Sequence, residues 1–337
     1  MPLQQHSAGR FGELMCVESE DAWIVSESSA RLSEAGYRGA RETLRQQGDS
    51  AAVLLVQVGD LLANVFAETW EALPQRLAAL AIRPPVASCL VARPTVALRR
   101  AVQVAGDANH FALWHCLVEL AKSGTRIEQH VGSSERMLVE WDTTPSIMDD
   151  AWLPDLLMNP PRRELDWLFA ELRLARLSDL CGPTVSSADA TAVLAGLWLL
   201  HGDADASHRQ SQSIEDEGRH RCGNYWHAIM HRQEPDYGNS KYWFRRVGQH
   251  PIFPELARRA DQFIAAELIA TDASDALQRW RSKLGTPNGW DPFAFVDWCE
   301  AAAGEADLSQ IALIRRIQFL EMHLLLRASY ADATRST

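Results

Sequence analysis

The histidines His227 and His231 are the residues of this sequence best spaced for metal chemistry. They lie in residues 225–253, YWHAIMHRQEPDYGNSKYWFRRVGQHPIF, where histidine, arginine, acidic and aromatic residues are more concentrated than elsewhere in the chain. Two residues four apart on a helix share one face within about 6 Å, so both imidazoles can bind one ion. Glu234 extends the same stripe, and Pro235 ends the helix there. We therefore expect a site formed by His227, His231 and Glu234 for a divalent metal such as zinc, iron or manganese, with coordination positions left open.

This spacing differs from that of the HExxH zinc proteases, because the residue after His227 is not a glutamate. A general base would have to come from elsewhere, such as Asp203 or Asp236. The alternative is structural: both imidazoles pack beside aromatic core residues and hydrogen-bond to backbone or carboxylate groups. Further titratable residues could reach the same cleft, namely His201, Asp203, His208, His220 and His250.

A group of cationic residues lies in the same stretch of a chain that is acidic overall. Forked guanidinium donors suit a carboxylate or a phosphate, so these residues predict a site for a small anionic molecule if they face a cleft. Nearby aromatic residues would form the wall of that pocket. The alternative is that the cations pair with Glu234, Asp236 or Glu255 and that the aromatic residues are core. The candidate ligand-binding residues are Tyr225, Arg232, Lys241, Trp243, Arg245 and Arg246.

The segment 225–253 also resembles a known group of proteins. Together with LHGDADASHRQSQSI before it and WDPFAFVDWCE after it, the segment is similar to an uncharacterised family of bacterial and fungal proteins. The resemblance covers residues 190–300, and it implies that this region is the shared module without implying an activity. Residues 215–224 are longer and more charged than that family would lead one to expect.

An offset of 33 residues aligns residues 192–214 with residues 225–247. The alignment matches Ala195 with Ala228, Asp203 with Asp236, and Ser207 with Ser240. Both segments have the pattern of an apolar helix, a short turn containing Asp, and a second polar helix. A period of 33–34 residues is typical of tetratricopeptide-like helix pairs, so we expect a repeat-like arrangement, with a generic helical domain as the alternative.

The remaining elements that must position these residues are mostly helical. Asp291 followed by Pro292 is a strong helix start, because aspartate caps the helix and proline needs no hydrogen-bond partner in the first turn. Gly132 and the two serines after it indicate a hairpin turn within residues 126–141. Helices are expected over residues 28–46, 107–122, 164–177, 187–200, 254–270, 292–304 and 308–330, and a strand and helix or a kinked helix over residues 51–69.

Four prolines within residues 142–163 mark a domain junction. We therefore predict a mainly α protein with a smaller α or α+β region over residues 1–145, a junction over residues 146–163, and a helical, repeat-like domain over residues 164–330. The 337-residue length is sufficient for two domains.

Composition excludes several classes of function. The chain has 33 basic and 44 acidic residues, a formal net charge of −11 that disfavours nucleic-acid binding. Its six cysteines are widely scattered, which indicates free thiols rather than a zinc knuckle or redox pair. The N-terminus lacks the pattern of a signal peptide, and no apolar run approaches the roughly 20 residues that span a bilayer. We expect a cytoplasmic protein that binds neither nucleic acid nor membrane.

Two functions are consistent with these patterns. The first is a soluble helical protein that binds a small anionic molecule or a protein partner through the His/Arg/aromatic surface. The alternative is a metal-dependent enzyme that acts on a small anionic substrate through His227 and His231, with Arg245 or Arg246 holding the substrate.

Overall fold

The structure is a computed structural model of the 337-residue chain. It describes residues 8–11, 14–18, 22–27, 30–47, 51–85, 88–107, 111–132, 139–141, 153–157, 163–270, 275–286, 289–304 and 308–335.

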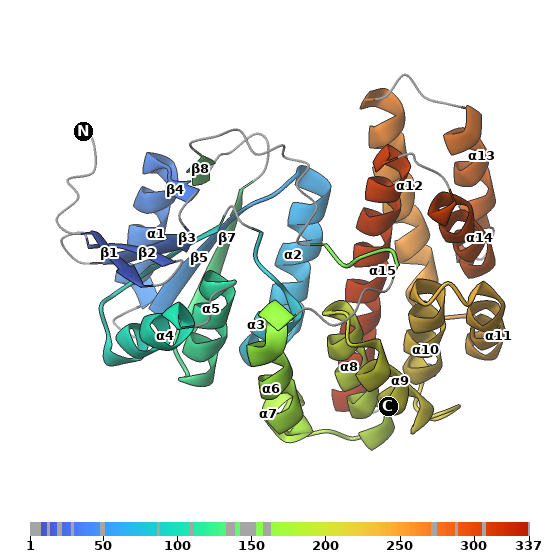
Figure 1. Cartoon of the computed structure of the whole chain (residues 1–337), viewed down its shortest axis with the longest axis horizontal. Coiled ribbons are helices and arrows are strands. Elements are labelled where there is room, and N and C mark those ends of the chain that lie inside the picture. Colours follow the sequence, from blue (N-terminus) through green and yellow to red (C-terminus); the bar gives the residue numbers. More distant parts are fainter. Residues whose placement is uncertain are drawn as a thin grey trace. The chain divides into compact units, whose positions relative to one another are not determined.

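The N-terminal part is built on a six-stranded sheet of order β1-β2-β3-β6-β5-β7 (Figure 1). Neighbouring strands are antiparallel except β5 and β7, which run parallel. Strand β5 is buried throughout residues 51–56, as its uninterrupted apolar sequence predicts for a strand covered on both faces. The strands are β1 (Ala8–Phe11), β2 (Leu14–Glu18), β3 (Trp23–Glu27), β5 (Ala51–Gln57), β6 (Ser88–Ala92) and β7 (Arg126–Gly132).

Helices cover this sheet. Tyr37, Ala40 and Leu44 of α1 share a core cluster with Val53 and Leu55 of β5. Helix α5 packs against β3, β6 and β7. The helices of this part are α1 (Glu34–Gln47), α2 (Asp60–Ala72), α3 (Gln75–Ala81), α4 (Val96–Gly106) and α5 (Ala112–Lys122).

The hairpin predicted over residues 126–141 is wrong. Strand β7 pairs in parallel with β5, whereas β8 (Val139–Trp141) pairs with β4 (Ala30–Leu32) in a separate two-stranded sheet. A strand that follows a helix, as β7 follows α5, enters the sheet by a crossover connection and can pair in parallel with an earlier strand. The local turn signal therefore did not determine the pairing.

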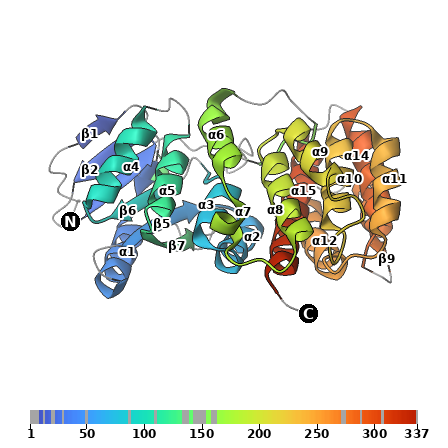
Figure 2. The ribbon, with the colours of Figure 1, turned by 90° about the horizontal axis from the view of Figure 1, so that it is seen from below.

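The C-terminal part is helical apart from the two short strands β9 (Gly285–Thr286) and β10 (Gly289–Trp290) among its described residues. Helix α10 is buried on all sides. It packs against α8, α9, α11 and α15, and Figure 2 shows it between α9 and α11. The helices are α6 (Asp166–Leu174), α7 (Leu177–Cys181), α8 (Ser187–Leu200), α9 (Ala204–Gln212), α10 (Cys222–Gln233), α11 (Tyr237–Val247), α12 (Phe253–Ala270), α13 (Asp275–Leu284), α14 (Pro292–Ala303) and α15 (Leu308–Thr334), preceded by a 3-10 turn at Arg163–Leu165.

The predicted mainly helical fold is confirmed, and of the two alternatives for the N-terminal region, α or α+β, the structure has the α+β one. The cap predicted at Asp291 is confirmed, because its carboxylate accepts backbone hydrogen bonds from the first turn of α14. The carboxylates of Asp203 and Asp236 cap α9 and α11 in the same way. Asp203 and Asp236 are the pair that the 33-residue offset aligns. A tetratricopeptide-like repeat beyond this correspondence is not confirmed.

The chain divides into two compact units, each made of two segments of sequence. Unit 1 comprises residues 1–152 and 163–170, and unit 2 comprises residues 153–162 and 171–337. Residues 163–170 belong with unit 1, where the Trp167 ring stacks on His115 at a centroid distance of 4.2 Å. The backbone carbonyl of Asp155 accepts hydrogen bonds from Gln233 and Gln318, which ties the segment 153–157 to unit 2.

None of the described helices has the length and apolar character needed to cross a membrane.

Candidate metal centre

Helices α9 and α10 carry three histidines that converge in unit 2. His208 comes from α9, and His227 and His231 come from α10. The four-residue spacing on α10 stacks the two imidazole rings at a centroid distance of 4.8 Å, as predicted from the sequence. The His208 ring lies edge-on, with its centroid 4.7 Å from that of His227 and 5.8 Å from that of His231.

The segment between α9 and α10 is fixed by polar contacts. The backbone N–H of Asp216 donates to the Asn224 side chain at 3.0 Å, and the Asn224 amide donates back to the Asp216 carboxylate at 2.7 Å. The backbone N–H of Arg219 donates to the buried carboxylate of Asp189 on α8. Gly218 has a φ of +83°, a conformation that favours glycine, beside that same carboxylate. The charged segment 215–224 therefore forms a defined turn that leads from α9 into α10.

The three imidazoles form a compact donor set. One ligand atom from each of His208, His227 and His231 can be chosen so that all lie within 4.8 Å of one another. In the described part of the chain, this is the one cluster of three or more His, Cys, Asp or Glu residues that meets this spacing. A tetrahedral zinc ion with Zn–N bonds of 2.0–2.1 Å holds its nitrogens about 3.4 Å apart. The most widely separated ligand atoms would therefore have to approach one another by up to about 1.4 Å to bind one zinc ion.

His227 is the least satisfied member of the set. Its side chain is only 2% exposed, and neither ring nitrogen has a hydrogen-bond partner among the described residues. Its ring stacks on Trp243 of α11 at a centroid distance of 4.0 Å, which fixes the plane of the imidazole. Burial, followed by the neighbouring His231 and His208, lowers the pKa of His227 to about 3. The ring is therefore neutral at physiological pH and has a lone pair available for a metal.

His231 is held by polar groups of the α10–α11 turn. Its Nδ1 lies 3.1 Å from Glu234 Oε2, and its Nε2 lies 3.0 Å from the side-chain nitrogen of Asn239. Burial lowers the pKa of His231, although the Glu234 and Asp236 carboxylates act in the opposite direction. A carboxylate bonded to the remote nitrogen of a metal-binding histidine is a usual second-layer arrangement that orients the ring.

The compact donor set differs in one member from the predicted metal ligands His227, His231 and Glu234. Glu234 bonds to the ring of His231 and is absent from the compact donor set, whereas His208 belongs to it. From the sequence, His208 was only one of several titratable residues that could reach the same cleft as His227 and His231. No local sequence pattern distinguishes His208 from His201 or His220 as a metal ligand.

The predicted cationic surface is not assembled as expected, because Arg232 is inside the core. Its Nη2 lies 2.5 Å from Glu321 Oε2 of α15, and both side chains have no exposed surface. The same nitrogen donates to the side-chain oxygen of Gln318 at 3.2 Å, and the guanidinium lies 4.6 Å from the centroid of the Phe295 ring. An arginine so enclosed has no free face for a ligand.

The other predicted cations lie nearer the surface, on α11. Lys241 pairs with Asp297 of α14 at 2.5 Å. Arg246 pairs with Asp216 and with Glu215, the latter at 2.9 Å. Arg245 is exposed, with its guanidinium 5.9 Å from the Phe293 ring centroid. The acidic partners come from other elements rather than from Glu234, Asp236 or Glu255.

The aromatic candidates are core residues. Tyr225 has no exposed surface, and its hydroxyl donates to Glu321 Oε1 at 2.9 Å. Trp243 is 7% exposed and stacks on His227. Trp243 therefore serves the histidine cluster, whereas Tyr225 belongs to the buried network around Arg232.

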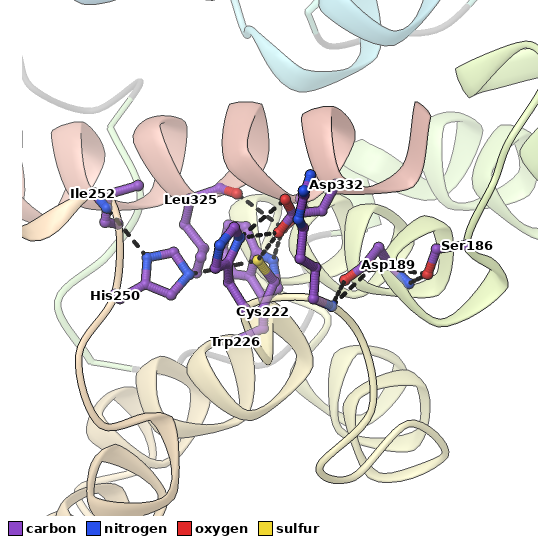
Figure 3. A network of polar contacts seen from close by, with 11 residues as sticks. Ser186, Asp189, Cys222, Trp226, His250, Ile252, Leu325 and Asp332 are labelled. Atoms are coloured by element: carbon purple, nitrogen blue, oxygen red, sulfur yellow. Dashed lines mark hydrogen bonds and ion pairs between the residues drawn. The ribbon is translucent and has the colours of Figure 1, made fainter. Parts of the chain in front are cut away.

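A second polar network lies at the start of α10 (Figure 3). Cys222 Sγ lies 3.6 Å from His250 Nε2 and 3.7 Å from Asp332 Oδ2, and Asp332 also accepts a hydrogen bond from His220 Nδ1 at 2.7 Å. Cys222 has no exposed surface, and burial raises the pKa of its thiol well above the ordinary value. The backbone N–H of Ile252 bonds to His250 Nδ1, so the Nε2 of a neutral His250 carries hydrogen and cannot take a proton from the thiol. We interpret the network as structural rather than nucleophilic.

His323 of α15 provides an instructive comparison with His227. It is 1% exposed, and both of its ring nitrogens lack hydrogen-bond partners among the described residues. Burial lowers its pKa to about 3, followed by the effects of His201 and Arg327. It belongs to no compact set of three donors in the described part of the chain. The two imidazoles thus share burial and lack of partners, and only His227 has two further donors beside it.

Comparison with protein-family models, with curated proteins and with solved structures found no match to this chain. The resemblance of residues 190–300 to an uncharacterised family stays a prediction.

Proposed function

We propose that unit 2 binds a divalent metal ion through His208, His227 and His231 and that the protein is a metal-dependent enzyme. The observation that carries this proposal is the buried His227 ring, which has no hydrogen bond among the described residues but has two further imidazole donors within 4.8 Å. A buried polar group without a partner costs about 1–3 kcal/mol. A metal ion would use the His227 lone pair and remove much of that cost.

Three protein ligands are the number found at catalytic zinc sites, where the fourth position holds water or substrate. A zinc ion held there would lower the pKa of a bound water to about 7, as it does at other catalytic zinc sites. His208, which is only partly buried, gives the centre a side open to solvent, and Glu234 orients His231. The reaction class that fits is attack of metal-activated water on an electrophilic carbon or phosphorus atom.

We propose no guanidinium clamp for the substrate at this site. Arg232 is enclosed with Glu321, and Arg246 is paired with acidic residues. The charged side chains that act on His231 are the carboxylates of Glu234 and Asp236. We therefore propose a small substrate held mainly by the metal rather than by arginine.

Metal analysis of protein purified without a histidine tag tests this function. We expect about one equivalent of zinc, iron or manganese per chain, and an increase in thermal stability when the preferred ion is added to metal-free protein. At a free ion concentration 100 times Kd, binding raises the free energy of unfolding by about 2.7 kcal/mol. Absence of bound metal, together with unchanged stability on addition of all three ions, would refute the proposal.

The variant His227→Phe keeps an aromatic ring on Trp243 and removes both nitrogens, so it should lose the metal. His323→Leu is the matched control, because it removes another buried imidazole whose nitrogens also lack partners among the described residues. The control should retain the metal. Equal loss of bound metal in both variants would show that the loss follows from replacing any buried histidine, and not from removing a metal ligand.

A further inference from the structure

Residues 153–157 form a short segment of unit 2 that lies outside any helix or strand, and its main chain is held by side chains from two helices. Arg315 of α15 donates through Nη2 to the Leu153 carbonyl at 2.7 Å. The same guanidinium donates through Nε to the Pro154 carbonyl at 3.1 Å. One arginine fork therefore binds two consecutive peptide carbonyls.

The next carbonyl of the segment has two donors. Gln233 at the end of α10 and Gln318 of α15 each donate from Nε2 to the Asp155 carbonyl at 2.9 Å. Both glutamine side chains are buried. Arg232 donates to the Gln318 side-chain oxygen at 3.2 Å, so the –NH₂ end of that amide faces the segment. We call the set of Gln233, Arg315 and Gln318 the carbonyl clamp.

The side chains of the segment add apolar and charged contacts. Leu153 and Leu156 are 2% and 5% exposed. The Asp155 carboxylate lies 3.5 Å from Arg315 Nη2. Pro154 has no backbone N–H that could be left without a partner, and it favours an extended conformation at Leu153. Hydrogen bonds to the main chain, together with buried side chains at intervals, are the means by which proteins recognise extended peptides.

We propose that the carbonyl clamp is a binding site for an extended peptide of the pattern Leu-Pro-Asp-Leu, and that residues 153–157 occupy it as an internal ligand. A partner protein that exposes a stretch of this pattern would compete with the segment for the clamp. A covalently attached ligand has an effective concentration on the order of millimolar, so the segment is an autoinhibitory contact. The proposal does not depend on the metal centre.

Binding of a fluorescein-labelled peptide of residues 151–159, AWLPDLLMN, to the full chain tests the proposal. Leu153→Ala/Leu156→Ala weakens the internal segment, because it removes both buried leucine side chains. Fluorescence anisotropy should show that this variant binds the peptide at least about tenfold more tightly than wild type, since its internal competitor is weaker. The same peptide carrying Leu153→Ala and Leu156→Ala should not bind.

Arg315→Met, added to the double variant, removes the fork and should abolish peptide binding. Arg316→Met is the matched control on the same helix, because its guanidinium pairs with Glu267 at 3.7 Å, and it should bind the peptide as the double variant does. If the double variant does not fold by circular dichroism, Leu156→Ala alone provides the comparison with wild type. Binding no tighter than that of wild type, or binding that survives Arg315→Met, would refute the proposal, whether or not the protein holds a metal.

Discussion

The buried pair of Arg232 and Glu321 provides a quantitative test of the C-terminal core. Both side chains are fully enclosed, and the charges meet at 2.5 Å. Arg232→Met would fill similar space but leave Glu321 without its counter-charge. Removal of one partner of a buried ion pair costs about 3–5 kcal/mol. Because a domain is stable by only about 5–15 kcal/mol, this single change should remove a large part of the stability of unit 2.

The double variant Arg232→Met/Glu321→Gln should cost far less than either single change. Glutamine keeps an oxygen that can accept the hydrogen bond from Tyr225, which in the wild type joins the hydroxyl to Oε1 at 2.9 Å. Replacement of a whole buried ion pair by neutral groups is often close to neutral. The coupling energy between the two positions should therefore be at least about 2 kcal/mol.

Urea unfolding, followed by tryptophan fluorescence and by far-UV circular dichroism, measures these energies. Since the chain has two compact units, both signals should be fitted for more than one transition. A cost below about 1 kcal/mol for Arg232→Met, or additive costs in the double variant, would refute the reasoning that the pair is isolated from solvent.

Three further predictions follow from buried groups and helix ends. Burial lowers the pKa of His323 to about 3 while the unfolded value is about 6.5, so the unfolded chain binds the proton first. His323 should therefore contribute a decrease of about 2 kcal/mol in the free energy of unfolding between neutral pH and pH 5. His227 and His250, whose pKa values are also lowered to about 3, should add similar contributions, and His323→Leu should remove only its own part of the slope in urea titrations. Gly196→Ala places a methyl group 2.5 Å from the Trp226 ring and should lower the free energy of unfolding by about 1–3 kcal/mol. Gly238→Ala, where a methyl group meets no atom nearer than 4.0 Å, should be neutral or stabilising by up to about 1 kcal/mol. Equal melting temperatures for the two variants would contradict this packing argument. Asp291→Ala removes the cap that bonds to the N–H groups of Phe293 and Ala294, and calorimetry should show a loss of about 1 kcal/mol, with Asp291→Asn nearly unaffected.

The sequence predicted what local periodicity and capping control. The helix pairs around Asp203 and Asp236, the start of α14 at Asp291, and the shared face of His227 and His231 all depend on residues within a few positions of one another. The strand pairing in unit 1 was missed because β7 finds its partner β5 about 75 residues earlier in the chain, a distance that local patterns do not encode.

The members of the site were predictable only in part for the same reason. His208 reaches His227 because α9 and α10 pack together, and Arg232 is enclosed because α15 brings Glu321 to it from 89 residues away. A charged residue on a helix with aromatic neighbours is more often exposed than buried, so burial of Arg232 needed a partner that the local sequence does not reveal. Trp243, expected in a pocket wall, instead supports the ring of His227.

The assignment of residues 163–170 to unit 1 has a practical result for anyone who wishes to study either half alone. The chain passes from one unit to the other three times, after Trp152, after Arg162 and after Ala170, so no single cut separates them. A fragment that begins at residue 171 lacks the Asp155 carbonyl to which Gln233 and Gln318 donate. A fragment that ends at residue 152 lacks the Trp167 ring that covers His115. A linker that joins residues 153–162 to residues 171–337, or residues 1–152 to residues 163–170, would keep each segment with its partners.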